Sequence, residues 1–537
     1  KGQISASSLA NAGDWLRSGA LPTAAIDSLK DLCDRGAWAE LEDRFYKGIA
    51  FGTGGMRGRT VGRVSAANEL DAQGLPVRAA IGSACLNDIN VLRAVIGLWK
   101  HVSATQPSAR LVVAHDVRHF SRHFAELIAG AWTELGGEAY LFVGARSTPQ
   151  LSFTVRHLGA HAGVVITASH NPSHDNGFKC CLSDGGQVLP PHDAAIVAEV
   201  GKLGPADVAP YLETDISRVL TVPASAEDAY LARVAGVVLD PEVISRHTPK
   251  VVYTNVHGTG DVMVVPALRR VGIDPHVVEE QREHDGRFPT VASPNPENAS
   301  TFALALKLAD EIGADLILAT DPDSDRVGVA CPLPAGGHRL LNGNEVAALL
   351  TEFRISSLKD AGILPAAGSP NAAVVKSLVT TPLVAAICAR HGVRCVETLV
   401  GFKWIARKLE KWSRRLSEAA GAEAAVLPLL IVASWRATPP AVIDGSKVVR
   451  VTDYERDKVI DAEGDRVPPE EFILAELADG RRIAVRASGT EPKAKFYSFT
   501  KAEVADADDL PAARERARHS ALGLRAWLEA DAKRRAK

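Results

Sequence analysis

The sequence predicts an α/β protein built from several domains. Short apolar runs rich in β-branched residues end in polar, glycine-rich turns and lead into stretches with helical spacing. Examples of such runs are residues 111–114, 163–167, 251–254 and 316–319. This alternation is typical of α/β architecture. With 537 residues, the chain is long enough for about three to five domains of ordinary size.

Breaks in composition divide the chain into four segments. Proline- and glycine-rich stretches, which favour turns and linkers, lie near residues 222–225, 333–337 and 438–445. The predicted domains are residues 1–220, 221–335, 336–437 and 438–537. Helical spacing also predicts helices in residues 1–48 and a terminal helix in residues 512–537.

Composition and charge exclude several classes of protein. A chain with 46% hydrophobic and 23% charged residues has the composition of a globular protein. The formal net charge of -3 gives no overall attraction to nucleic acid or to an anionic membrane. The most apolar stretch, residues 424–435, is shorter than the roughly 20 residues that span a bilayer. We therefore predict no transmembrane helix, no membrane association and no nucleic-acid partner.

The cysteines favour a reducing compartment. Seven cysteines are scattered along the chain without the paired CxxC spacing of a zinc site. The chain also opens without a basic segment followed by an apolar one, the pattern of a secretory signal. We therefore expect reduced thiols and a cytoplasmic location.

The first candidate for chemistry is Ser169. Residues 167–172, Thr-Ala-Ser-His-Asn-Pro, follow the predicted strand at 163–167, and ligands of open α/β sheets bind at the carboxyl ends of strands. The Gly-x-Ser-x-Gly elbow of a serine hydrolase is missing. Taken alone, the motif fits either covalent transfer through the serine or an ordinary polar turn.

The second candidate is an acidic turn. Asp321, Asp323 and Asp325 alternate directly after the predicted strand at 316–319. Two like charges about 4 Å apart repel by roughly 4 kcal/mol at an effective dielectric constant near 20, and a bound cation reverses that cost. Oxygen ligands favour Mg²⁺ over zinc. The Gly and Glu that complete an EF-hand are absent, so the alternative is a solvated acidic turn.

Two more loops suit phosphate binding. Residues 52–58, Gly-Thr-Gly-Gly-Met-Arg-Gly, combine a flexible backbone with the cation of Arg57. Residues 486–493, Arg-Ala-Ser-Gly-Thr-Glu-Pro-Lys, combine a guanidinium, hydroxyls and backbone N–H groups. Residues 52–58 complete neither the Gly-x-Gly-x-x-Gly motif of dinucleotide-binding proteins nor the P-loop motif of nucleotide-binding proteins. A structural role explains each of these two loops alone equally well. Residues 257–260 and 401–403 are further polar turns, and such a turn taken alone is more often structural than catalytic.

Together and in this order, the motifs resemble the α-D-phosphohexomutase superfamily of phosphoglucomutases and phosphomannomutases. The resemblance runs from about residue 51 to 497 and includes Ser-Pro-Asn-Pro-Glu at 293–297. The runs at 52–58 and 401–404 look most like the long phosphoglucomutase and phosphopentomutase branch. This resemblance implies four domains around a central cleft. Three are related α/β domains, and the fourth is a smaller, TATA-binding-protein-like α+β domain at the C-terminus.

The resemblance also implies roles for the candidate residues. Ser169 would carry a phosphoryl group in the first domain, and the Mg²⁺ ligands would be Ser169, Asp321, Asp323 and Asp325. The residues lining the reaction centre would be Arg57, His170, Lys179, Arg326 and Lys403. Among these, Lys403 and His170 are favoured for proton transfer. The clamp for the substrate's other phosphate would be Arg486, Ser488, Gly489 and Thr490 in the last domain.

The implied activity is interconversion of hexose 1-phosphate and hexose 6-phosphate, with glucose favoured over mannose. It would proceed through phosphoserine and a bisphosphorylated sugar such as glucose 1,6-bisphosphate. The partner would be a small-molecule sugar phosphate, and the sequence does not predict an oligomeric state. Two alternatives stay open: a phosphopentomutase acting on ribose or deoxyribose phosphates, and a non-catalytic homologue that binds sugar phosphates.

One part of the family pattern is missing. The third domain of the family carries a sugar-recognition loop with a Gly-Glu-x-Ser-Gly-like core. Residues 413–436 contain no such pattern, and the segment looks several tens of residues too short. Either the protein carries a deletion here or the sequence omits residues, and the intact flanking motifs favour omission. The choice among sugars is therefore not determined by the sequence.

Overall fold

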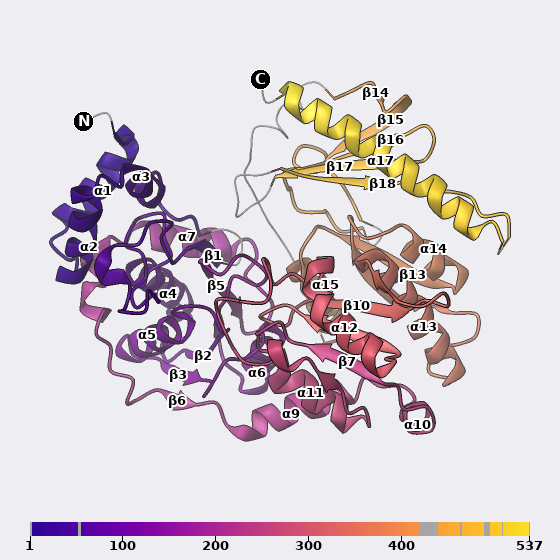
Figure 1. Ribbon diagram of the computed structural model, residues 1–537, viewed down its shortest axis with the longest axis horizontal. Helices are drawn as coiled ribbons and strands as arrows, with labels where there is room; N and C mark the ends of the chain where they lie inside the picture. Colours follow the sequence, from indigo (N-terminus) through magenta and orange to yellow (C-terminus); the bar gives the residue numbers. More distant parts are fainter. Residues whose placement is uncertain are drawn as a thin grey trace. The chain divides into compact units, whose positions relative to one another are not determined.

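The computed structural model divides into two compact units, Lys1–Val346 and Ala347–Lys537 (Figure 1). The residues described are 3–51, 55–417, 435, 439–461, 464–487, 494–506 and 508–535. Within these ranges, no helix combines the length and the apolar character needed to cross a bilayer. The predicted sugar-recognition segment lies largely outside the described residues, as do Gly52–Gly54 and the loop at 488–493.

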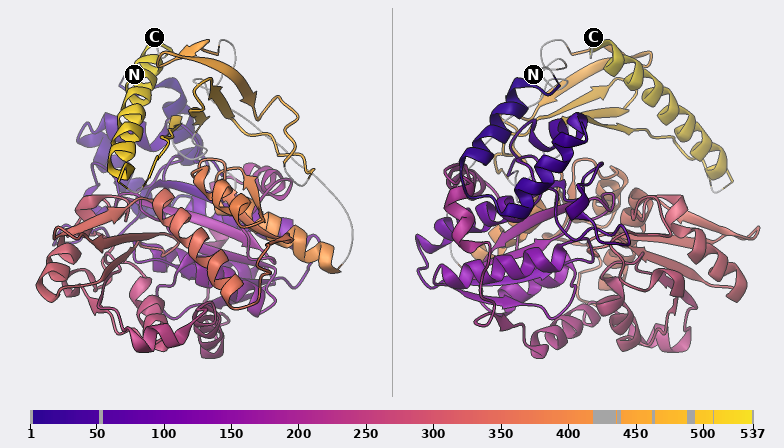
Figure 2. Two further views of the ribbon diagram at one scale, coloured as in Figure 1. Left: turned by 90° about the vertical axis from the view of Figure 1, so that its right-hand side faces the viewer. Right: turned by 60° about the vertical axis from the view of Figure 1, so that its left-hand side comes forward.

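Three helices open the chain, as predicted. They are α1 (Ala6–Arg17), α2 (Thr23–Asp34) and α3 (Trp38–Phe45), and they form the indigo group in Figure 2. The side chain of Ser5 accepts a hydrogen bond from the backbone N–H of Ser8 and caps α1. Trp15 packs edge-on against Phe45 with ring centroids 6.1 Å apart, which joins α1 to α3.

A six-stranded sheet forms the centre of the first domain. Its strands, in spatial order, are β1 (Gly55–Arg59), β5 (Asp175–Leu182), β4 (Ala162–Ile166), β2 (Arg110–His115), β3 (Glu138–Leu141) and β6 (Leu220–Thr221). Strands β2, β3, β4 and β6 run parallel, whereas β5 is antiparallel to β4 and to β1. The predicted strands at 111–114 and 163–167 are thus confirmed as β2 and β4.

Helices cover both faces of this sheet, and alternate residues of β2 are accordingly buried in two different hydrophobic clusters. Leu111 and Val113 pack with residues of α4 (Asp88–Ser103) and α5 (Ser121–Glu134), and Val112 and Ala114 pack with residues of α6 (Thr148–His157) and α9 (Ala224–Ala235). A strand buried on both faces reads as a continuous apolar run. The other helices of this domain are α7 (His192–Gly201), α8 (Pro205–Val208) and the 3₁₀ turns η1 (Ala67–Glu69) and η2 (Ala209–Tyr211).

A five-stranded sheet forms the second domain. Its strands, in spatial order, are β11 (His338–Leu341), β10 (Val327–Pro332), β9 (Leu316–Thr320), β7 (Val251–Thr254) and β8 (His276–Val277). Its helices are α10 (Pro241–Arg246), α11 (Gly260–Arg270), α12 (Ala303–Ile312), η3 (Glu279–Gln281) and η4 (Ala299–Phe302). The predicted strands at 251–254 and 316–319 are confirmed as β7 and β9.

The two sheets share one strand arrangement. In spatial order, β3-β2-β4-β5 of the first sheet corresponds to β8-β7-β9-β10 of the second. In each case three parallel strands are followed by an antiparallel one. The turn after β4 holds Ser169, and the turn after β9 holds the three aspartates. The two strongest sequence motifs thus occupy equivalent positions in two related domains.

Two predicted boundaries fall inside sheets. The break at 333–337 is the turn of the β10–β11 hairpin, where Gly336 and Gly337 take positive φ angles of 89° and 74°. The boundary between 335 and 336 therefore cuts a hairpin, because glycines that permit a tight turn look like linker residues in the sequence. Similarly, the boundary between 220 and 221 cuts β6, which pairs with β3.

The second unit contains two groups of elements. The first group is α13 (Gly343–Asp360), which begins in the first unit, α14 (Leu383–Arg390), α15 (Phe402–Ser417) and the parallel pair β12 (Ser369–Ser377) and β13 (Val393–Thr398). The second is an antiparallel sheet of β14 (Val442–Ile443), β15 (Ser446–Asp453), β16 (Phe472–Leu477), β17 (Arg482–Ala487) and β18 (Ala494–Phe499).

One long helix covers this antiparallel sheet. It is α17 (Leu510–Arg535), drawn in yellow in Figures 1 and 2, and it confirms the terminal helix that the spacing predicts. Leu524 and Leu528 of α17 are buried with Ile473 and Val485 of the sheet. The C-terminal domain is therefore a sheet with a helix on one face, as expected for a small α+β domain.

A buried ion pair network fastens the N-terminal helices to the first domain. Arg44 on α3 donates to both carboxylate oxygens of Glu69, at 2.6 and 2.9 Å, and to Glu40 at 2.7 Å. The three side chains are 1–3% exposed. Removing one member of such a network leaves uncompensated buried charge, which typically costs about 3–5 kcal/mol.

We therefore expect Arg44→Met to lower the free energy of unfolding of the N-terminal unit by about 3–5 kcal/mol, measured by urea denaturation followed by circular dichroism. Arg17→Met is the matched control, because Arg17 pairs with Asp14 while both side chains are 72% exposed. An exposed pair contributes little. Equal losses of stability in the two variants would contradict the role of the buried network.

Candidate active site

Ser169 lies in the turn after β4, with its hydroxyl directed at the acidic turn. The residue is 1% exposed and its Oγ donates a hydrogen bond to Oδ2 of Asp321 at 2.6 Å. His170 Nδ1 lies 3.2 Å from the same Oγ. The backbone of Ser169 is left-handed, with φ of 53°, and its N–H donates to Oγ1 of Thr167 at 2.8 Å. The two motifs therefore meet at one hydroxyl.

The three aspartates converge on one point. Their nearest carboxylate oxygens all lie within 4.8 Å of one another, and Asp321 and Asp323 are fully buried. Burial, reinforced by the neighbouring carboxylates, raises the pKa of Asp321 well above its usual range. Burial also acts to raise the pKa of Asp323, but the Lys179 ammonium outweighs it and lowers that pKa. The cluster carries negative charge that one lysine only partly balances.

Lys179 provides that balance. Its Nζ lies 2.5 Å from Asp323 Oδ2 and 3.1 Å from Asp325 Oδ2. Burial disfavours the ammonium, yet the two carboxylates outweigh burial and raise the pKa of Lys179. In this arrangement Lys179 is a buried cation beside the cluster, so it is suited to bind an anionic group.

The acidic cluster fits a hard divalent cation. Asp323 Oδ1 is buried and has no hydrogen-bond partner among the described residues, so one carboxylate oxygen is available as a ligand. Three carboxylates with a nearby hydroxyl form an all-oxygen donor set, the set that Mg²⁺ prefers. The residues that would hold the ion are Asp321, Asp323 and Asp325, with Ser169 beside them.

Two predicted arginines lie at the edge of this cluster. The backbone N–H of Arg326 donates to Oδ1 of Asp321 at 3.0 Å, and its Nε lies 3.9 Å from Asp325. Arg57 lies on β1, and its Nη1 is 3.5 Å from Oδ1 of Asn171 in the serine loop. The structure thus gathers Arg57, His170, Lys179 and Arg326 around Ser169 and the aspartates, all within the first unit.

The remaining predicted residues belong to the second unit. Lys403 lies in the first turn of α15, with its Nζ 5.4 Å from the ring centroid of Trp404. Arg486 lies near the end of β17 and pairs with Glu470 at 2.7 Å. Ser488, Gly489 and Thr490 lie outside the described residues. Their predicted roles stay predictions.

Of the residues that support the acidic turn, the sequence did not single out Thr148, and it indicated residues 257–260 only as a polar turn. Thr148, at the start of α6, donates its hydroxyl to Asp323 Oδ2 at 2.6 Å and its backbone N–H to the Asp323 carbonyl at 2.9 Å. From the turn after β7, the backbone N–H of Thr259 donates to the Pro322 carbonyl at 2.9 Å. A Cβ on Gly258 would lie 2.4 Å from the Pro322 Cα, so this contact requires glycine. The position of residues 257–260 directly after a predicted strand was the feature of the sequence that could have indicated their contact with the acidic turn.

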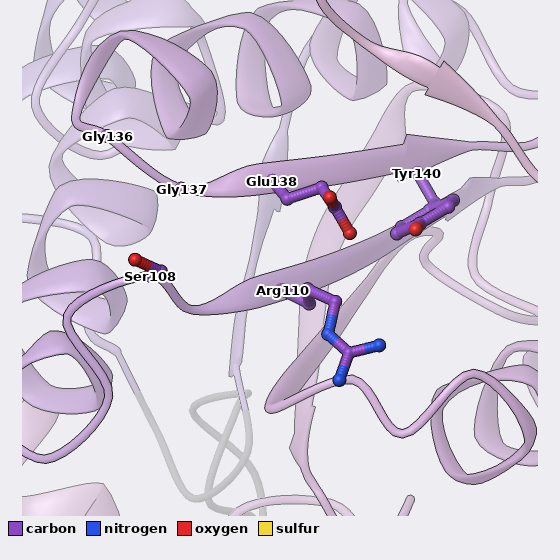
Figure 3. Close-up of a pocket in the computed structure, with 6 residues that line it drawn as sticks. All are labelled: Ser108, Arg110, Gly136, Gly137, Glu138 and Tyr140. Carbon is purple, nitrogen blue, oxygen red and sulfur yellow. The ribbon is translucent and has the colours of Figure 1, made fainter.

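A pocket at the opposite end of the strands of the first sheet is distinct from this site. Its volume is about 500 Å³, and Figure 3 shows the residues that line it around the first residues of β2 and β3. The residues that line it are Ser108, Arg110, Gly136, Gly137, Glu138 and Tyr140. Ser169 follows the carboxyl end of β4, which is parallel to β2. Because ligands of such sheets bind at the carboxyl ends of strands, the pocket is not the reaction centre.

Comparisons with known proteins agree with this geometry. Models of the phosphoglucomutase/phosphomannomutase alpha/beta/alpha domains I, II and III match residues 71–206, 228–334 and 342–424. The phosphoglucomutase of Staphylococcus epidermidis (strain ATCC 12228 / FDA PCI 1200) is 28% identical over 541 residues, covering 87% of this chain and 94% of the relative. That of Staphylococcus aureus (strain bovine RF122 / ET3-1) is 28% identical over 549 residues, covering 88% and 93%.

A solved structure shares the fold. The phosphoglucomutase/phosphomannomutase family protein from Burkholderia thailandensis matches with a TM-score of 0.54 at 17% identity, covering 88% of this chain and 96% of that one. The three α/β domains, the β-rich C-terminal domain and the matched models define a phosphosugar mutase, an intramolecular phosphotransferase. The chain belongs to the α-D-phosphohexomutase superfamily, in its phosphoglucomutase branch.

The proposed ion site can be tested by binding. We expect Asp323→Asn to weaken Mg²⁺ binding at least about tenfold, because affinity for hard cations depends on the number of charged ligands. Isothermal titration with Mg²⁺ measures this directly. Asp274→Asn is the control, since Asp274 is 79% exposed and pairs with Arg269. Unchanged affinity in Asp323→Asn would contradict the assignment.

Proposed function

We propose that this phosphohexomutase interconverts glucose 1-phosphate and glucose 6-phosphate through phosphorylated Ser169 and a bisphosphorylated glucose. The observation that supports it best is the convergence of the Ser169 hydroxyl on the acidic cluster, at 2.6 Å from Asp321, with Lys179 beside it. A serine that only filled a turn would need neither a buried carboxylate cluster nor a buried cation.

In the first transfer, the phosphorus–oxygen bond to Ser169 breaks and a bond forms to a free hydroxyl of the sugar monophosphate. The hydroxyl proton passes to a base, for which Lys403 and His170 are the candidates, and the Ser169 oxygen that leaves takes up a proton. His170 is favoured for the transfer at Ser169, because its Nδ1 lies 3.2 Å from Ser169 Oγ. Lys403 stays the alternative. Lys179 and Arg326 would bind the equatorial oxygens of the transferring group.

The proposed Mg²⁺, held by the three aspartates, would offset negative charge on the transferring phosphoryl group. In the second transfer, the reoriented bisphosphate returns its other phosphoryl group to Ser169. The proposed clamp for the phosphate that is not reacting is the loop of Arg486, Ser488, Gly489 and Thr490.

The choice of glucose rests on the relatives, which are phosphoglucomutases. The second candidate is a phosphopentomutase, favoured by the long-branch features of residues 52–58 and 401–404. The retained serine and complete acidic cluster do not favour a homologue that only binds sugar phosphates. We retain the third domain limit, between residues 437 and 438, where the composition places it.

Turnover of glucose 1-phosphate and ribose 1-phosphate, each primed with the matching bisphosphate, separates the two candidates. We expect glucose 1-phosphate to have at least about tenfold higher kcat/KM, a difference of about 1.4 kcal/mol in transition-state stabilisation. Ser169→Ala should abolish turnover of both, and Ser173→Ala, in the same loop, should retain it. Efficient ribose turnover with negligible glucose turnover would contradict the proposal.

A further inference from the structure

The loop that carries Ser169 closes around one buried guanidinium. Arg118 follows β2 and its side chain is fully buried. Its Nη1 donates to the carbonyl oxygens of Pro172 and Asp175, at 2.6 and 3.0 Å, and its Nη2 donates to those of Ser169 and Asn171, both at 2.5 Å. All four Nη hydrogens are thus used by carbonyls of a single loop.

A second group of contacts holds the guanidinium itself. Asp116 Oδ2 lies 3.2 Å from Arg118 Nε as an ion pair, and Asp116 Oδ1 accepts from the Arg118 backbone N–H at 2.9 Å and from the Ser121 hydroxyl at 2.7 Å. The Arg118 guanidinium also lies 5.0 Å from the ring centroid of Phe288 in the second domain. A Cβ on Gly286 would lie 2.6 Å from the Val117 carbonyl oxygen, so that segment packs directly on the backbone beside Arg118.

The conformation held in this way is one that serine does not favour. Ser169 has a φ of 53°, and strained backbone of this kind persists only where its surroundings fix it. The carbonyl of Ser169 accepts from Arg118, and its N–H donates to Thr167. These two bonds hold the peptide groups on both sides of the Ser169 Cα, and hence the direction of its hydroxyl toward Asp321.

We propose that Arg118 is a positioning residue of the mutase reaction: by binding four carbonyls of the serine loop, it holds the Ser169 hydroxyl at the acidic cluster. This inference rests on the proposed function of Ser169. Arg118 does not contact the reacting oxygen, and its contribution is to the geometry of transfer. Lysine cannot replace it, because one ammonium has three donors and no planar fork.

The test compares Arg118→Lys with Arg44→Lys in the full-length enzyme. Both arginines are almost fully buried in the N-terminal unit, but the contacts of Arg44 are with Glu40, Glu69 and the Val64 carbonyl. A displacement of about 1 Å in a catalytic group can cost 10²-fold in rate. We expect Arg118→Lys to lower kcat about 100-fold, while KM for glucose 1-phosphate changes less than about threefold. Arg44→Lys should lower the melting temperature without changing kcat of the folded enzyme.

If Arg118 had a purely structural role, Arg118→Lys would lower the melting temperature and leave kcat of the folded enzyme unchanged. Displaced reacting groups would lower kcat by more than about threefold. The inference is therefore overturned if kcat of Arg118→Lys stays within about threefold of the wild type. If Arg118→Lys does not fold, Arg118→Gln decides, because its neutral amide has two donor hydrogens in place of the five of the guanidinium. A fall in kcat of about 100-fold at unchanged KM supports the inference, and a kcat within about threefold of the wild type overturns it.

Amide hydrogen exchange separates this inference from the proposed function. In Arg118→Lys, the peptide spanning residues 167–176 should exchange faster than in the wild type, while in Arg44→Lys it should not. If the wild type turns over no sugar phosphate, the proposed function fails, and the exchange rates still test the positioning of the loop. Unchanged protection of residues 167–176 in Arg118→Lys would overturn the inference.

Discussion

The site depends on one hydrogen bond between two domains, from the Ser169 hydroxyl to the Asp321 carboxylate at 2.6 Å. Each residue lies in the turn between the last parallel strand and the antiparallel strand of its sheet. Since such turns lie at the carboxyl ends of strands, where α/β sheets bind ligands, two copies of one arrangement place the Ser169 hydroxyl and an acidic cluster opposite each other.

Electrostatic balance is the second constraint. Two fully buried carboxylates and a third, partly exposed one lie within a few ångströms, and Lys179, Arg326 and the hydroxyls of Ser169 and Thr148 are their partners. Such a cluster is unfavourable without cations. A transferring phosphoryl group and Mg²⁺ would bring opposite charges to the same place, so the cluster fits a site at which anions are bound together with a metal.

Much of the fold could be predicted from local patterns. Continuous apolar runs predicted β2, β4, β7 and β9 because strands buried on both faces leave that pattern, and the functional turns followed from their position after these strands. The exact residues of the domain limits near 220 and 335 could not be predicted, since the glycines of the β10–β11 hairpin look like a linker. Pairing of β6 with β3 is likewise a contact between residues far apart in the sequence.

The same reason explains which site residues the sequence left out. Ser169 and the aspartates stand in short motifs, whereas Thr148 and Arg118 act through contacts with residues 175 and 51 positions away. No short motif contains such a pair. The sequence therefore indicated the groups proposed to react, and the structure was needed to find the groups that hold them in place.

The most direct test of this account is to locate the phosphate that the enzyme takes from a bisphosphorylated sugar. The wild-type enzyme is mixed with glucose 1,6-bisphosphate and Mg²⁺, quenched in acid, digested and examined by tandem mass spectrometry. The account predicts phosphate on Ser169 and none on Ser173 in the same peptide. Turnover of glucose 1-phosphate by an enzyme whose phosphate lies on another residue, or that takes none, would contradict it.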